Sequence, residues 1–282
     1  MVPLIQQKRI DYGLWILLAT VFILQYADFI RSVSSVWLSV PEFSFGVLIP
    51  GIVTYLVWIR RNDLINAATG IWPAGAAVVL AGCALRVLAV LSGTLVLSGI
   101  ALAISLAGIV GFVWGSRSMR IAAVPFSLLT LMIPLPSYVL ETLTWHLQVM
   151  ASTLSGAGLS LLGIPVYQDG NLLNLPNYVL EVEQACSGSR SIFALIAMAL
   201  VLAFTFERKW LVRASLVVAA PLLAIAANVV RIVGTGLLAF HFGAAAANES
   251  LHAAWGVMVF VMAVMGLLGL QRILRWVTNG YA

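Results

Sequence analysis

The stretch Glu181–Arg190, EVEQACSGSR, joins a polar segment of the chain to a long apolar one. It holds Cys186, one of only two cysteines among the 282 residues. A thiol at such a junction lies where water, a peptide and a lipid bilayer can meet. We therefore interpret the rest of the chain as a scaffold that brings two further residues, Arg231 and His252, to this cysteine.

The composition excludes a soluble domain. Hydrophobic residues make up 62% of the chain and charged residues only 9%, with a mean hydropathy of +1.06, whereas a soluble domain carries about 25% charged residues. The apolar runs are close to helical spanning length, which favours membrane helices over barrel strands. The net charge of +5 comes from short basic clusters between these runs. No basic patch interleaved with aromatic residues is present, so nucleic acid is not an expected partner.

The hydropathy pattern predicts an all-α membrane protein with about eight transmembrane helices. We expect one domain over residues 1–282, with an outer-loop insertion at about 136–186. The first apolar run follows Lys8 and Arg9 and has no clear cleavage site, so it is interpreted as a retained span. The predicted spans are 12–30, 44–59, 74–91, 95–114, 121–134, 188–206, 211–240 and 252–271. The fifth is shorter than the usual ~17–25 residues.

The basic residues predict the orientation in the membrane. Eleven of the fifteen lie at alternate ends of the predicted spans: Lys8, Arg9, Arg60, Arg61, Arg117, Arg120, Arg208, Lys209, Arg213, Arg272 and Arg275. The positive-inside rule makes that side cytoplasmic, so both termini are expected there. Arg31, Arg86, Arg190 and Arg231 lie toward the outer half, where each needs an explanation.

The insertion before Cys186 has two parts. In the first, 137–162, apolar residues recur at helical spacing, with Glu141, Gln148, Ser152 and Ser155 between them: Leu140, Leu143, Leu147, Met150 and Leu154. This pattern indicates a small amphipathic helix on the outer face or a helical hairpin that dips into the bilayer. In the second part, turn signals at Asp169-Gly170 and Pro176-Asn177 separate β-prone runs and predict a short β-meander. Extended backbone beside a candidate nucleophile is suited to hold a peptide.

Three chemically useful side chains are predicted at one depth. Cys186 lies just before the sixth span, and His252 at the outer start of the eighth. Arg231 follows the cytoplasmic start of its span by 20 residues, which at ~1.5 Å per residue is about one hydrocarbon thickness. A cysteine thiolate is a nucleophile, histidine can take and return its proton, and arginine can stabilise an oxyanion. The helix dipole after Cys186 favours the thiolate.

Two neighbours are candidate supporting residues. Asn228 lies one turn before Arg231 and is placed to hold its guanidinium. Arg190 lies one turn after Cys186, where it either lowers the pKa of the thiol or pairs with Glu181 or Glu183.

Several of the cysteines, histidines and arginines also have purely structural interpretations. A cysteine inside a membrane span is usually a small hydrophobic residue, which is how Cys83 is interpreted. His252 taken alone fits an interfacial histidine, and His146 and His241 are rival bases without comparable placement. Arg86 is a candidate structural partner for an outer acid.

Three motifs follow one another along the chain: Ala185-Cys186-Ser187-Gly188 followed by Arg190, then Asn228-Val-Val-Arg231, then His252 ahead of Trp255-Gly256. Together they resemble the exosortase/archaeosortase family. Ile133-Pro134-Leu135-Pro136 and Gly163-Ile164-Pro165-Val166 before Asp169-Gly170-Asn171 are also similar, and the likeness covers roughly residues 40 to 270. One departure is Phe43-Ser44-Phe45-Gly46, where many members have a histidine before the glycine.

The resemblance implies a cysteine transpeptidase of the bacterial inner membrane, with Cys186, Arg231 and His252 as nucleophile, arginine and histidine. Its implied partners are exported proteins that end in a PEP-CTERM-type sorting signal with a Pro-Glu-Pro-like motif, a spanning helix and a basic tail. Cleavage is expected on the periplasmic side, with an unknown acceptor and no metal or organic cofactor. Two alternatives stay open: a plain membrane cysteine protease, and a non-enzymatic transporter or scaffold of polysaccharide assembly, which a kink at Pro221 would favour.

Overall fold

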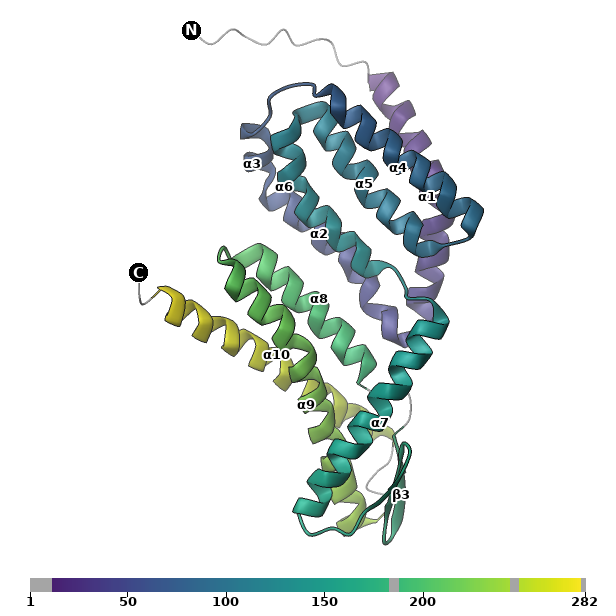
Figure 1. Cartoon of the computed structure of the whole chain (residues 1–282), viewed down its shortest axis with the longest axis vertical. Helices are drawn as coiled ribbons and strands as arrows, with labels where there is room; N and C mark the ends of the chain where they lie inside the picture. The colour runs from purple at the N-terminus through teal and green to yellow at the C-terminus, as the bar shows by residue number, and fades with distance from the viewer. Residues whose placement is uncertain (1–11, 183–187, 244–248, 280–282) are drawn as a thin grey trace. The chain divides into compact units, whose positions relative to one another are not determined.

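The computed structural model describes residues 12–182, 188–243 and 249–279. The described chain is mainly helical with one small three-stranded sheet (Figure 1), so the predicted all-α membrane class is confirmed. The chain divides into two compact units, Met1–Val40 with Ile49–Pro134 and Pro41–Leu48 with Leu135–Ala282.

The first unit is a bundle of helices in which α4 and α5 pack most closely. Its elements are α1 (Tyr12–Ser39), nearly all of α2 (Leu48–Ile59), α3 (Arg61–Asn66), α4 (Pro73–Ser92), α5 (Leu95–Trp114), α6 (Ser116–Ser127) and the 3-10 helix η2 (Leu128–Met132). A Cβ at Gly75 of α4 would lie 2.3 Å from the backbone nitrogen of Phe112, and one at Gly108 of α5 would lie 2.8 Å from that of Val79. Small residues let helices approach this closely inside a membrane.

A buried arginine stabilises the first unit. The Arg86 side chain of α4 is 5% exposed, and its Nη2 lies 2.5 Å from the Asp28 carboxylate of α1. Its Nη1 donates to Ser98 Oγ at 2.8 Å, and its Nε donates to the Gln25 carbonyl at 3.2 Å. The predicted structural partner acid is therefore Asp28, and the rest of the guanidinium is also hydrogen-bonded.

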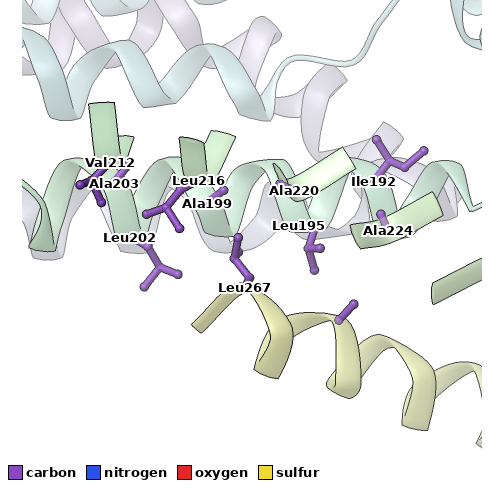
Figure 2. Packing of buried hydrophobic residues seen from close by; sticks show 11 residues of the cluster. Ile192, Leu195, Ala199, Leu202, Ala203, Val212, Leu216, Ala220, Ala224 and Leu267 are labelled. Atoms are coloured by element: carbon purple, nitrogen blue, oxygen red, sulfur yellow. The ribbon is translucent and has the colours of Figure 1, made fainter. Parts of the chain in front are cut away.

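The second unit is built around α9. Its elements are η1 (Pro41–Val47), α7 (Ser137–Leu161), β1 (Tyr167–Asp169), β2 (Leu172–Leu175), β3 (Tyr178–Glu181), α8 (Ser189–Phe206), α9 (Trp210–Phe242) and α10 (Glu249–Asn279). α9 packs against α8, α10 and α7. It runs as one helix through Pro221, without a break there. α8, α9 and α10 share a cluster of buried hydrophobic residues. In Figure 2, Leu267 of α10 points toward Leu195 and Leu216 of this cluster, and all three side chains are fully buried.

The predicted β-meander is present and packs on α7 and α9. The strand order is β1-β2-β3, with both pairs antiparallel. Gly170 has a φ of +59°, which suits the first central position of a type II′ turn. Leu173, Leu180 and Val182 form a buried cluster with Leu159 of α7 and Ile232 of α9. The sheet is thereby fixed beside the stretch of α9 that carries Arg231.

The prediction of about eight spans is too high for the described chain. Six helical segments are long and apolar enough to cross a membrane: Pro41–Ile59, Pro73–Ser92, Leu95–Trp114, Ser189–Phe206, Trp210–Phe242 and Ala254–Thr278. Ser116–Met132 together with Ser137–Leu161 adds at most one more. The predicted span 121–134 is not one regular helix, because α6 contains Pro125 and the chain continues as η2 from Leu128. Proline removes a backbone donor and disturbs the preceding turn.

The predicted helix of the insertion is confirmed as α7. It is continuous from Ser137 to Leu161, so the alternative of a helical hairpin is wrong. Its buried face includes Thr144, Gln148, Ser152 and Ser155, whereas Leu143, Met150 and Leu154 are exposed. Leu140 is buried and Leu147 is partly buried, so only part of the apolar stripe is exposed.

Candidate active site

The α9 helix holds two of the predicted site residues on adjoining turns. Asn228 and Arg231 are three residues apart, a spacing that places both side chains on neighbouring parts of one helix face. Asn228 is buried at 5% exposure, and Arg231 is half-buried. A charged side chain within a membrane-spanning helix is costly and is usually functional.

The start of α8 packs directly on Asn228. Gly188 caps α8 in the left-handed region, with a φ of +79°. A Cβ at this position would lie 3.1 Å from Cγ of Asn228. Both the backbone conformation and the close contact therefore require glycine here. Gly188 follows Cys186 by two residues in the sequence.

The first part of α10 packs on Arg231 from another direction. Trp255 donates its indole N–H to the Arg231 carbonyl at 3.1 Å, and Thr235 Oγ1 donates to the same oxygen at 3.0 Å. A Cβ at Gly256 would lie 3.1 Å from Cζ of Arg231, so the guanidinium lies against this glycine. Gly234 in turn leaves room for the Trp255 ring, since a Cβ there would come within 2.7 Å of it.

The structure thus brings together described residues from all three predicted motifs. Gly188, Asn228, Arg231, Trp255 and Gly256 lie in successive contact across α8, α9 and α10. The predicted nucleophile Cys186 lies outside the described residues. His252 falls in the first turn of α10, one turn before Trp255, and its side chain also lies outside the described part.

The other candidate residues are exposed or lie in the first unit. Arg190 is exposed in the first turn of α8, and within the described residues it forms no ion pair with Glu181; Glu183 lies outside them. The rival base His146 is exposed on α7, with its Nδ1 2.7 Å from the Thr142 carbonyl. His241 is exposed near the end of α9, with its ring against Phe240. Cys83 is partly buried in α4 of the first unit.

Residues that our sequence reasoning missed support Arg231 from its own helix. Gly234 admits the Trp255 ring, and Thr235 bonds the Arg231 carbonyl. Their only sequence signal is a run of small residues, Gly234-Thr235-Gly236, directly after the arginine inside a spanning helix. Such residues mark close helix packing in membranes.

Comparison with known proteins identifies the family. The family model described as transmembrane exosortase (Exosortase_EpsH) matches residues 37–269, which include every element of the candidate site. Comparison with curated proteins gave no match, and comparison with solved structures gave none. Membership assigns the chain, in general terms, to the membrane sorting transpeptidases of the cysteine type. Because the match covers most of the chain and includes the three motifs of the candidate site, we conclude that this multi-span membrane protein belongs to the transmembrane exosortase family.

Proposed function

We propose that this chain cleaves the C-terminal sorting signals of exported proteins on the periplasmic side of the bacterial inner membrane, with both of its own termini in the cytoplasm. The substrates would carry a Pro-Glu-Pro-like motif, a spanning helix and a basic tail, as in PEP-CTERM proteins. The observation that carries the proposal is the contact of Gly188 with Asn228 and of Arg231 with Gly256. These contacts connect α9, which carries Arg231, with the start of α8, which follows Cys186 in the sequence, and with α10, which includes His252.

The proposed reaction proceeds through a thioester. The Sγ of Cys186 attacks the scissile carbonyl after His252 has taken the thiol proton, and a C–S bond forms. Arg231 stabilises the oxyanion of the tetrahedral intermediate. The C–N bond then breaks, and His252 returns the proton to the leaving amine. An acceptor amine or water attacks the thioester and restores the Cys186 thiol.

Arg231 suits the oxyanion role because its position is defined from two sides. The backbone carbonyl of Arg231 is held by Trp255, and the guanidinium rests on Gly256. A donor that is already oriented costs little reorganisation when charge develops in the transition state. The neighbouring Asn228 is proposed to keep the start of α8, and with it the cysteine-bearing segment, in place through Gly188.

The test is co-expression with a model substrate. The substrate is an exported reporter that ends in a Pro-Glu-Pro-containing signal, a spanning helix and a basic tail. Cys186→Ala should abolish cleavage while the protein still inserts, and Cys186→Ser should be nearly inactive because a hydroxyl has a far higher pKa. The matched control is Cys83→Ala, which should process normally. Full processing by Cys186→Ala would contradict the proposal.

The fate of the reporter separates transpeptidase from protease. Mass analysis of its new C-terminus should show a covalently attached acceptor. A free carboxylate on every product molecule would instead identify water as the acceptor and a membrane cysteine protease as the activity.

A further inference from the structure

The sheet of the second unit ends in two edges whose backbone groups can be assigned. Among the residues that the structure describes, β1 and β3 each pair only with β2. The Val182 amide donates to the Asn171 carbonyl at 2.9 Å, directly beyond the pair Leu172↔Glu181. In an antiparallel ladder, hydrogen-bonded and non-hydrogen-bonded pairs alternate. The pairs of Glu181 with Leu172 and of Val179 with Asn174 are therefore non-hydrogen-bonded, so the backbone N–H and C=O of Val179 and Glu181 point away from β2.

The side chains of β3 alternate between an exposed face and a face that is buried against α9. Val179 is 54% exposed, and Glu181 is exposed. Between and beyond them, Leu180 and Val182 are buried against Ile232, the residue that follows Arg231. The edge is therefore held on the part of α9 that carries Arg231. The chain continues from Val182 into the segment that contains Cys186.

The opposite edge is less suited to receive a strand. β1 has only three residues. The Gln168 side chain at its centre donates to Thr153 Oγ1 at 3.1 Å and to the Gly170 carbonyl at 2.9 Å. Short strands are a common protection against unwanted pairing. β3 has four residues, and among the described residues no side-chain hydrogen bond ties Val179 or Glu181 in this way.

We propose that β3 binds the extended segment of the substrate around its cleavage site as a fourth strand. This inference rests on the proposed function and specifies how the substrate is held. The Val179 and Glu181 backbone groups would pair with every second substrate residue, which leads the peptide toward the level of Arg231. Prolines at the alternate substrate residues are tolerated, because their missing N–H would face away from β3.

The first test removes the outward donor of Val179. Proline is accepted where an edge N–H faces outward, so Val179→Pro should leave the protein folded. Its ring would block an added strand, and kcat/KM for the model substrate should fall about tenfold through the loss of backbone hydrogen bonds, with the effect mainly in KM. The matched control is Gln168→Pro, at the central outward position of the β1 edge, which should process normally. Equal activity of both variants would overturn the proposal.

A second measurement does not depend on turnover or on the proline variant. In a Cys83→Ala, Cys186→Ala background, Val179→Cys is treated with a short thiol crosslinker in the presence of substrates that carry single cysteines at successive positions. Strand addition predicts strong crosslinks at every second substrate position. Uniform crosslinking, or stronger crosslinking from Gln168→Cys, would overturn strand addition. Because cleavage by Cys186→Ala is measured separately, failure of the proposed function remains distinguishable.

Discussion

Two arginines at similar predicted depth have different surroundings. Arg86 of α4 is enclosed in the first unit, where a carboxylate, a hydroxyl and a backbone carbonyl bond its guanidinium. Arg231 of α9 is half-buried in the second unit and rests against Gly256 of α10, and Asn228, three residues before it, contacts Gly188 at the start of α8. Both arginines stand within apolar runs at the sequence level.

The difference teaches how a membrane protein uses an intramembrane charge. A guanidinium neutralised by its own chain stabilises the helix packing around it. The Arg231 guanidinium packs against Gly256, and the Arg231 carbonyl accepts a hydrogen bond from Trp255. Such an oriented side chain suits the oxyanion role proposed for Arg231. Variants of the two sites should therefore separate stability from activity.

The largest effect is expected at the Arg86 pair. Asp28→Ala removes the carboxylate and leaves a buried guanidinium without its counter-charge, so stability should fall by about 3 kcal/mol. Thermal unfolding of the purified protein in detergent measures this loss. Adding Arg86→Met should recover much of it, since Arg86 is the buried member of the pair and an apolar side chain can replace it, whereas the Asp28 side chain is 67% exposed. If Asp28→Ala unfolded at the parental temperature, the structural role of Arg86 would be wrong.

The next effect is catalytic and concerns Arg231. Losing one oxyanion donor costs about 3 kcal/mol, or ~10²-fold in rate. Arg231→Ala should show this loss in the processing assay, with an unfolding temperature close to that of the parent. Arg231→Lys should also be strongly impaired, because it keeps the charge and loses the planar fork. Crosslinking should show that both variants still bind substrate; loss of binding alone would exclude the oxyanion role.

The next prediction concerns His252, the proposed general base. His252→Ala should slow processing by ~10²-fold or more and raise the apparent pKa of the Cys186 thiol. The alkylation rate of Cys186 as a function of pH reports that pKa. His146→Ala and His241→Ala serve as controls with parental profiles. Normal processing by His252→Ala, with an unchanged alkylation profile, would count against the assignment.

The smallest effect is expected from the glycine that supports Arg231. In Gly256→Ala the new methyl would lie 3.1 Å from Cζ of Arg231, so the guanidinium must shift by a few tenths of an ångström. We expect processing to fall about tenfold, since misplaced catalytic groups lose rate steeply. Gly269→Ala on the same helix is the control, because nothing lies within 4 Å of its Cβ. Equal rates for both variants would show that the contact with Gly256 is not needed.

Sequence reasoning predicted the elements better than their faces and contacts. The helix at 137–162 and the meander with its Asp169-Gly170 turn were predictable, because periodicity and turn chemistry are local. The inward orientation of Ser152 and Ser155 was not, because in a bilayer the apolar side can face lipid. The change to a 3-10 helix after Pro125 also depends on packing within the first unit.

The geometry around Arg231 was not predictable from the sequence. Spacing and charge placed Arg231 near the predicted level of Cys186 and His252. Spacing alone could not show that Gly188 contacts Asn228, or that Trp255 bonds the Arg231 carbonyl. These contacts join helices far apart in the chain. Likewise, nothing in the sequence near Arg86 indicates that Asp28 is its partner.

The most direct test of the account is to trap the acyl-enzyme. The protein and the model substrate are mixed, quenched in acid within one turnover, and digested for mass spectrometry. The account predicts the N-terminal part of the substrate attached to Cys186 through a bond that hydroxylamine cleaves, since a thioester is the proposed intermediate. An adduct on any other residue, or cleavage that continues at the parental rate in Cys186→Ala, would contradict it.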